Sequence, residues 1–398
     1  MGSGDSNGNA QQTSALAGFY RLDVEGRRQR LVEHAHLEPA DLEAYEPGRS
    51  LTVEAADSMV ENALGVFSLP MGVCVNMRLD GRDRLAPMVI EEPSVIAAAS
   101  HAAKLLRAGG GVESHATDAI VAGQMQLLDV PDFDAAERAI MAASTELLDE
   151  ANGLNRRLIA AGGGARSLEI RRLEPEGDDD PLGPMLIIHL DVDVRDAMGA
   201  NIVNTMCEHL APRLEHLTGG RARLRILSNL CDRRTVTVRG RVPLSTLGED
   251  LATGIVEASV FAERDPYRAA THNKGIMNGV DAVMLATGQD WRAVEAGAHA
   301  YAARSGRYTA LARWRVRDDA LEGQMTLPLA VGTVGGIVRV HPSVQSSLRL
   351  AAIESARDLA TLAAAVGLAQ NLGALRALAG EGIQTGHMRL HARNVSVE

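Results

Sequence analysis

The chain has 398 residues, of which 46% are hydrophobic and 3% aromatic, and its 40 Lys and Arg against 51 Asp and Glu give a formal net charge of −11. This composition is typical of a globular protein of about two to four domains, and it excludes disorder of the whole chain. An acidic chain with neither a basic, aromatic-rich segment nor an apolar run of ~18 residues is not expected to bind nucleic acid or to span a membrane.

Local patterns predict the elements of the first part of the chain. Residues 1–14 are rich in Gly, Ser, Asn and Gln, which is typical of a flexible tail. Apolar residues at helical spacing predict a helix over 56–64. Apolar residues alternate with other residues over 73–79, and a second run follows at 85–90. With Asp80-Gly81 between them, these two runs predict the strands of a hairpin. Pro93 then opens an alanine-rich helix over about 94–108, which ends at three glycines.

The middle of the chain has the pattern of an inserted module, from about residue 118 to 229. A strand, a long charged helix and a break at Gly162-Gly163-Gly164 precede a strand at 185–194, a helix from Asp196 and a strand at 221–227. The remainder, 230–380, combines a strand at 235–242 with helices near 249–262, 291–304 and 351–379. The chain therefore mixes helix and strand throughout.

Cysteines and histidines favour no metal site. Cys74, Cys207 and Cys231 lie far apart and form no C-x-x-C pair, so each is expected to be a buried thiol in a reducing compartment. This favours a cytoplasmic location. The twelve histidines show no spacing typical of metal ligands.

Two segments place polar side chains at the start of a helix. In Glu91-Glu92-Pro93-Ser94 the carboxylates either cap the helix or include a general acid. In Asp196-Ala-Met-Gly-Ala-Asn201 the small residues let a phosphate or ribose approach the backbone N–H groups, or the Asp is a simple N-cap. No G-x-G-x-x-G motif follows a strand, so a Rossmann domain is not indicated.

Two further segments concentrate polar side chains near glycines. Between Arg268 and Gly279, Lys274 could stabilise an oxyanion, form a Schiff base or bind a carboxylate. Asp290 is either its counter-ion or the N-cap of the next helix. His387 and His391 follow a glycine near the end of the chain, where an isolated His is more often a surface residue.

Together these motifs resemble class II, bacterial-type 3-hydroxy-3-methylglutaryl-coenzyme A (HMG-CoA) reductases. The likeness runs in order from about residue 50 to the end. Five motifs carry it: Glu61-Asn62-Ala-Leu-Gly65, Glu91-Glu92-Pro93-Ser94, Asp196-Ala-Met-Gly-Ala-Asn201, Thr271-His-Asn-Lys274-Gly-Ile-Met-Asn-Gly279 and Gly386-His387-Met-Arg-Leu-His391. Five motifs in register are a specific signal.

The resemblance implies reduction of HMG-CoA to mevalonate and coenzyme A by two hydride transfers from NADH or NADPH, through mevaldyl-CoA and mevaldehyde, without a metal. Lys274 would stabilise the oxyanion, Glu92 would donate or relay a proton, and Asp290 would tune both. His387 would protonate the leaving thiolate of coenzyme A. Ser94, Arg268 and Asn278 would hold the carboxylate and hydroxyl of the HMG group.

The implied fold is α+β. A large mixed helix/sheet domain, residues 15–117 and 230–380, would bind substrate and CoA, and a small ferredoxin-like, non-Rossmann domain over 118–229 would bind the dinucleotide. The residues that line the cofactor would include Asp196, Met198, Gly199, Ala200 and Asn201. Family members form homodimers that assemble into hexamers as trimers of dimers, with the active site between two subunits and the Glu61-Asn62 motif in their contact.

Two features depart from the family pattern. NADH-preferring relatives carry an aspartate shortly before the triple glycine, where this chain has Asn155 followed by Arg156 and Arg157, so the choice between NADH and NADPH stays open. Class II members also continue with a flap of several tens of residues, of which 381–398 would be only the start. A flap-less chain is expected to lose more rate in thiolate protonation than in reduction of free mevaldehyde.

Three alternatives compete with this interpretation. The same reaction run oxidatively would serve mevalonate catabolism, although isoprenoid biosynthesis is the commoner use. A Schiff-base, aldolase-type enzyme would use Lys274 covalently, and borohydride would trap it on a ketone substrate. A non-catalytic CoA- or nucleotide-binding regulator would lack at least one of the four implied catalytic residues, and all four are present.

Overall fold

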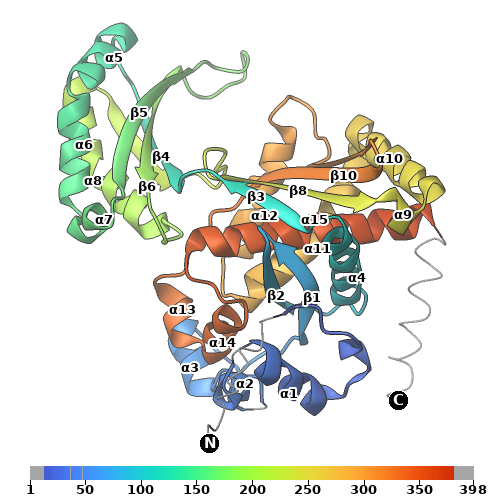
Figure 1. Cartoon of the computed structure of the whole chain (residues 1–398). Helices are drawn as coiled ribbons and strands as arrows, with labels where there is room; N and C mark the ends of the chain where they lie inside the picture. The colour runs from blue at the N-terminus through green and yellow to red at the C-terminus, as the bar shows by residue number, and fades with distance from the viewer. Residues whose placement is uncertain (1–12, 36, 47, 381–398) are drawn as a thin grey trace, which may run out of the picture.

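The structure of the chain is a computed structural model that describes residues 13–35, 37–46 and 48–380. These residues form two β-sheets, each with helices packed against it (Figure 1). Residues 381–398, which contain His387 and the expected start of a flap, lie outside the described residues.

The larger sheet has six strands in the order β2-β1-β3-β8-β10-β9. Only β1 and β3 pair in parallel among these neighbours. The strands are β1 (Met71–Leu79), β2 (Arg82–Val89), β3 (Val112–Ala116), β8 (Thr235–Pro243), β9 (Ala312–Arg317) and β10 (Ala320–Pro328). The predicted hairpin is confirmed in β1 and β2: Asp80 (φ 49°) and Gly81 (φ 76°) are both left-handed, as a two-residue hairpin turn requires.

Helices pack on one face of this sheet, and α15 runs through the middle of the assembly (Figure 1). The predicted helix after Pro93 is confirmed as α4. The helices of this part are α1 (Val24–Ala35), α2 (Pro39–Glu43), α3 (Val53–Met59), α4 (Val95–Ala108), α9 (Leu244–Leu247), α10 (Glu249–Arg264), α11 (Pro266–Ala286), α12 (Trp291–Ala303), α13 (Gly336–Val340), α14 (Pro342–Leu350) and α15 (Ala356–Ala379), with a 3₁₀ turn η1 (Phe19–Arg21).

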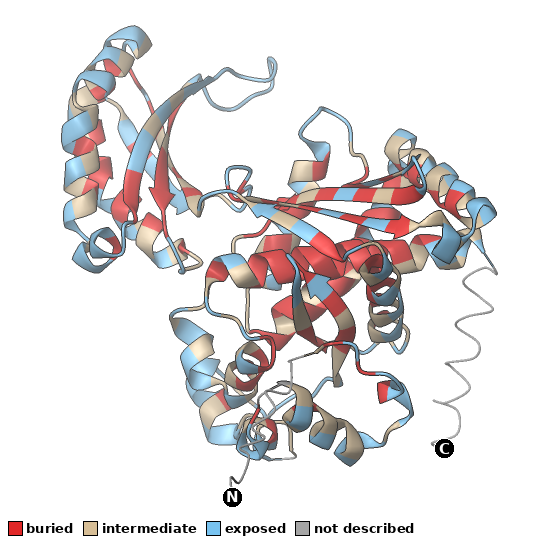
Figure 2. Ribbon diagram, viewed as in Figure 1, coloured by how far each residue is buried: buried red, intermediate tan, exposed pale blue. Residues whose placement is uncertain are grey.

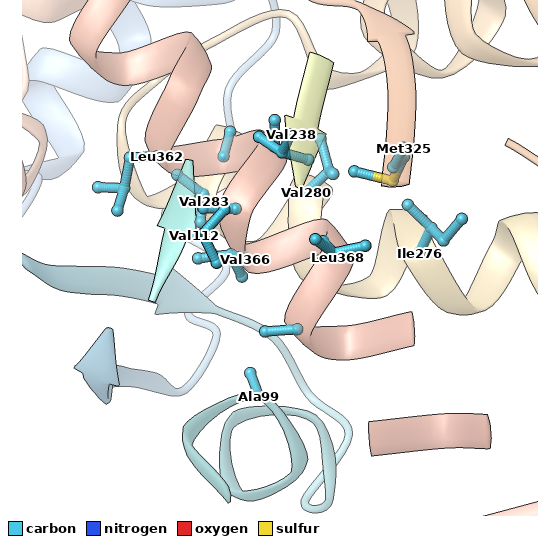
Figure 3. Close-up of a cluster of buried hydrophobic side chains, with 14 of the residues drawn as sticks. Ala99, Val112, Val238, Ile276, Val280, Val283, Met325, Leu362, Val366 and Leu368 are labelled. Atoms are coloured by element: carbon cyan, nitrogen blue, oxygen red, sulfur yellow. The ribbon is translucent and has the colours of Figure 1, made fainter. Parts of the chain in front are cut away.

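The helix α15 forms the centre of the core (Figure 2). Among the described residues it alone is long and apolar enough to cross a membrane, and most of it is instead buried inside this part of the protein. Two glycines let α11 and α15 pack closely, since a Cβ on Gly367 would lie 2.8 Å from Val280 and one on Gly279 would lie 2.9 Å from Gln370. Side chains of both helices and the neighbouring strands interdigitate in Figure 3: Val112, Val238, Ile276, Val280, Val283, Met325, Leu362, Val366 and Leu368.

The second sheet has four antiparallel strands in the order β5-β6-β4-β7. The chain leaves the larger sheet after β3 and returns to pair with β3 through β8. In between lie β4 (Ile120–Leu128), α5 (Phe133–Ala142), α6 (Ser144–Gly153), α7 (Arg156–Ala160), β5 (Gly164–Leu173), β6 (Met185–Asp193), α8 (Ala200–Thr218) and β7 (Arg221–Leu227). This β-α-β-β-α-β order is ferredoxin-like, and its antiparallel pairing differs from the parallel sheet of a Rossmann domain. Domain boundaries at 118 and 229 stay a prediction.

Two expectations about the N-terminal part are wrong in detail. The helix predicted over 56–64 ends at Met59, and Val60 is extended with φ −135° and ψ 138°. Beyond it Leu64 and Phe67 are exposed (103% and 91%), so the apolar spacing here does not mark a buried helical face. Ser14, the last residue of the expected tail, is fully buried and donates from Oγ to the carbonyl of Met77 at 2.6 Å.

Candidate active site

The described part of the protein brings Glu92, Ser94 and Lys274 together. Glu92 lies in the link between β2 and α4, and Lys274 lies on α11. The distance from Lys274 Nζ to Glu92 Oε2 is 3.8 Å, and Ser94 Oγ donates to Glu92 Oε1 at 3.1 Å. The side chains of Glu92 and Lys274 are 32% and 65% exposed. A cation next to a carboxyl group suits a reaction in which negative charge develops on a carbonyl oxygen and a proton is transferred to it.

The helix α11 presents its polar residues on two different faces. Lys274 is exposed, and Asn278, four residues later, lies on the same face and is half-buried; Arg268, in the first turn of the helix, is also half-buried. His272 and Asn273 lie on the buried face, at 2% and 0% exposure. Burial lowers the pKa of His272 to about 4, so this imidazole is neutral at physiological pH and adds no charge behind Lys274.

Asp290 begins α12 and is not in contact with Lys274. Its carboxylate accepts the N–H of Ala293 at 3.1 Å as an N-cap, and it lies 3.7 Å from Nε of Arg292. The structure therefore shows the helix cap that the sequence left open, while the ion pair of Lys274 is made with Glu92.

A cavity of 1960 Å³ adjoins these residues. Pro93 and Ile96 at the start of α4 line it, as do Gln289 and Trp291 on either side of Asp290. It also contains cationic side chains from two helices, among them Arg27 and Lys104. Its size and charge suit a long anionic ligand.

The turn from Asp196 to Gly199 leads into α8. Gly199 is the N-cap of this helix at φ 114°, and a Cβ there would lie 2.9 Å from Val194. Asp196 is not the helix cap that the sequence allowed. Its Oδ1 accepts the N–H of Ala356 at 2.9 Å, which ties the turn to the first residue of α15.

The triple glycine lies beside this turn. Asp193 is 4% exposed and pairs with Arg166 at 3.1 Å and Arg195 at 3.4 Å. Arg166 also donates to the carbonyl of Gly162. Arg166 therefore contacts the triple glycine, and Arg195 directly precedes Asp196 at the start of the turn. Because both pair with Asp193, two guanidinium groups lie between the triple glycine and the turn. Guanidinium groups and the N-terminus of a 19-residue helix suit the phosphates of a dinucleotide.

Asn155 is the N-cap of α7. Its Oδ1 accepts the N–H of Leu158 at 3.0 Å. The next two side chains, Arg156 and Arg157, are exposed, and no carboxylate of the described residues lies within ion-pair distance of either. No group of three or more potential metal ligands occurs among the residues at 13–380 that the structure describes.

Sequence reasoning missed Lys104 and Arg195. The signal for the lysine is compositional: only Lys104 and Lys274 are lysines among the 40 basic residues of the chain. One pairs with Glu92 and the other lines the adjoining cavity. Arg195 has a positive φ of 53°, but this strain is not visible in the sequence.

Comparison with known proteins identifies the relatives of this chain. Residues 23–392 match the family described as hydroxymethylglutaryl-coenzyme A reductase. The 3-hydroxy-3-methylglutaryl-coenzyme A reductase of Archaeoglobus fulgidus is 46% identical over 97% of this chain and 87% of its own length. The probable reductase of Borreliella burgdorferi is 34% identical, over 85% of this chain and 77% of its own.

Two solved structures have the same fold. The reductase of Streptococcus pneumoniae superposes with a TM-score of 0.88 at 40% identity, covering 96% of this chain and 91% of its own. The class II reductase of the same organism, bound to NADPH in open conformations, gives 0.87 at 40% identity, over 91% and 99%.

Proposed function

The chain belongs to the hydroxymethylglutaryl-coenzyme A reductase family, and we propose that the cluster of Glu92, Ser94 and Lys274 is the place where it reduces the HMG-CoA thioester. The reaction is the NAD(P)H-dependent interconversion of HMG-CoA with mevalonate and coenzyme A. The observation that carries this assignment is the 3.8 Å approach of the Lys274 ammonium to the Glu92 carboxylate.

Each residue of the cluster has a distinct role in this proposal. The nicotinamide cofactor, when bound, supplies hydride to the carbonyl carbon in each of two reductions. The ammonium of Lys274 stabilises the negative charge that develops on the substrate oxygen, and Glu92 delivers the proton to that oxygen. The hydroxyl of Ser94 holds the Glu92 carboxyl group through its 3.1 Å hydrogen bond. Asp290 fixes the start of α12 beside the cavity.

The substrate is proposed to occupy the accessible face of α11 and the adjoining cavity. Arg268 and Asn278 bind the HMG carboxylate and hydroxyl with Ser94. The coenzyme A portion fills the 1960 Å³ cavity, where Arg27 and Lys104 attract its phosphates. By its motif, His387 protonates the departing thiolate, a step that suits an imidazole because its ordinary pKa is near neutrality.

We propose NADPH as the preferred cofactor. The support is the neutral side chain at Asn155, the exposed guanidinium groups of Arg156 and Arg157, and the NADPH bound to the streptococcal relative. A 2′-phosphate meets no carboxylate at Asn155 and two cations next to it.

A homodimer that assembles further, to a hexamer, is proposed as the working state. The support is two exposed apolar side chains, Leu64 within the Glu61-Asn62 motif and Phe67 just after it. Three buried free thiols fit a cytoplasmic location, and reduction towards mevalonate is the proposed direction. Analytical ultracentrifugation would measure the assembly.

The Schiff-base alternative is less well supported. A lysine that attacks a carbonyl must be neutral, and enzymes achieve this by desolvation or by a neighbouring cation. Lys274 is 65% exposed and its neighbour is a carboxylate. The site therefore offers neither the desolvation nor the neighbouring cation that a Schiff-base lysine requires.

The test is loss of nicotinamide absorbance with HMG-CoA as substrate, with NADPH and NADH in separate reactions. Lys274→Met is expected to lower kcat about 10²–10³-fold, because one charge-stabilising donor is lost. Arg241→Met, which removes an exposed cation paired with Asp319, is the matched control and is expected to retain full activity. His387→Ala is expected to abolish HMG-CoA reduction while sparing reduction of mevaldehyde. Full activity of Lys274→Met would refute the proposed site.

A further inference from the structure

Arg234 is a buried cation just before β8. It is 6% exposed, and no carboxylate of the described residues lies within 4.0 Å of its guanidinium group. Burial lowers the pKa of Arg234 to about 10, so the side chain is still charged at neutral pH. A buried guanidinium group without a paired carboxylate destabilises the folded state unless its N–H groups make hydrogen bonds. The acceptors of those hydrogen bonds therefore indicate what Arg234 does.

The partners of this guanidinium are backbone carbonyls from two separate segments. Nη1 donates to the carbonyls of Ala197 and Met198 at 3.1 and 3.2 Å, in the turn before α8. Nη2 donates to the carbonyl of Val331 at 2.5 Å, in the segment after β10. The planar guanidinium group donates from two nitrogen atoms in a fixed fork geometry, so it can hold two segments at a fixed separation. The single ammonium group of a lysine cannot do this.

The two segments are in direct contact with each other. The N–H of Thr333 donates to the carbonyl of Asp196 at 2.9 Å. A Cβ on Gly332 would lie 2.5 Å from the backbone nitrogen of Met198, so no other residue fits there without movement of the turn. Arg234 therefore closes a tightly packed backbone junction.

This junction continues to the catalytic part of the site. The side chain of Gln289 donates to the carbonyl of Gly332 at 2.9 Å and accepts its N–H at 2.8 Å. Gln289 directly precedes Asp290. One short series of contacts thus links the turn before α8 with the start of α12.

We infer that Arg234 is a positioning residue, which holds the turn Asp196–Gly199 in the conformation that receives the dinucleotide and fixes this turn relative to Asp290. The inference rests on the proposed function and adds a residue from outside the motifs. The guanidinium also places positive charge behind the N-terminus of α8, where the phosphates of the cofactor are expected. Because its hydrogen bonds to the described residues all go to backbone carbonyls, Arg234 acts through the turn rather than on the substrate.

Three variants of the full-length enzyme test this inference. Arg234→Met removes the charge and the fork, and is expected to raise KM for NADPH at least about tenfold and to lower kcat, with KM for HMG-CoA within about twofold of wild type. Arg234→Lys keeps the charge without the fork, and is expected to give an intermediate KM for NADPH. Arg84→Met is the control, because Arg84 likewise donates to two carbonyls, of Ala351 and Ala352, away from the cofactor. It is expected to leave both KM values unchanged.

NADPH binding is also measured directly, by nucleotide fluorescence without HMG-CoA, so that affinity is read apart from turnover. If Arg234→Met does not fold, Arg234→Lys decides. Weaker NADPH binding by a folded Arg234→Lys protein supports the inference, and unchanged NADPH affinity and KM in that protein overturn it. An equal loss for NADPH and HMG-CoA would also overturn it, since that result indicates general destabilisation. Failure of the wild-type enzyme to oxidise either nucleotide with HMG-CoA would count against the proposed function instead.

Discussion

At Asn155 a single side chain combines a structural role with the proposed choice of cofactor. Its Oδ1 caps α7 through the N–H of Leu158, and aspartate caps a helix as well as asparagine does. Asn155→Asp is therefore expected to leave the melting temperature unchanged and to add only a charge. That charge repels a 2′-phosphate and accepts hydrogen bonds from ribose hydroxyls.

We accordingly predict that Asn155→Asp lowers the ratio of kcat/KM for NADPH to that for NADH by about tenfold or more. Steady-state kinetics with both nucleotides measure the ratio, with Asn155→Ser, a neutral cap, as the control. An unchanged ratio in a protein of normal stability would show that residue 155 does not interact with the ribose or its 2′-phosphate.

Asp281 is a half-buried carboxyl group on α11 whose surroundings favour the protonated form. Burial, and then the neighbouring carboxyl of Glu295, raise the pKa of Asp281 from 3.8 to about 9. None of the described residues makes a hydrogen bond to its Oδ1. The folded protein therefore binds this proton between pH 4 and 9 whereas the unfolded chain releases it, so stability falls as the pH rises through that window.

We predict that Asp281→Asn, which is neutral at every pH, is more stable than wild type and that its advantage grows with pH. The melting temperature is expected to be raised by about 1–3 °C at pH 8 and by less at pH 5. Thermal unfolding at the two pH values measures this. A constant difference between the proteins would indicate that Asp281 is ionised in the folded state.

At the scale of elements, the sequence predicted best where a local rule decides the structure. The hairpin of β1 and β2 follows from Asp80-Gly81, whose left-handed conformations define the turn. The helix α4 begins just after Pro93 and is followed by glycines. In both cases residues adjacent in the sequence are enough to predict the structure.

The helix α11 was not predicted because its signal is tertiary. Its 21 residues include Gly275 and Gly279, which lower helix propensity, and its buried face contains the polar His272 and Asn273. No amphipathic stripe results. Packing against α15 stabilises the helix, and Gly279 is required there because Gln370 leaves no room for a Cβ.

Residues of the candidate site could be predicted from the sequence only where they belong to a family motif. The resemblance named Glu92, Ser94 and Lys274, which the structure brings together. Arg195 and Arg234 could not be found in this way, since hydrogen bonds to backbone carbonyls or to an aspartate two residues away leave no spacing pattern in the sequence. The apolar spacing over 56–64 predicted a helix that continues too far along the chain: α3 ends at Met59, and Val60 and Leu64 are exposed in the isolated chain.

At the scale of the whole molecule, the two sheets have separate clusters of buried side chains. Both tryptophans of the chain, Trp291 and Trp314, belong to the part with the six-stranded sheet. Tryptophan fluorescence therefore reports on that part alone, whereas circular dichroism reports on both.

We predict that unfolding in urea, without cofactor, gives non-coincident transitions by these two methods, because each cluster can lose its packing separately. Arg234→Met is expected to widen the separation, since it removes the hydrogen bonds to Ala197 and Met198 that join the two parts. Coincident curves for both proteins would show that the chain unfolds as one cooperative unit.

The scarcity of lysine has a practical consequence for chemical labelling. Amine-directed reagents such as activated esters, aldehyde supports and bifunctional cross-linkers find only two side-chain targets in this protein. One is the partner of Glu92 and the other lines the cavity beside it. Conjugation or immobilisation through lysine would therefore modify the proposed active site first, and attachment through an engineered surface cysteine would avoid both amines.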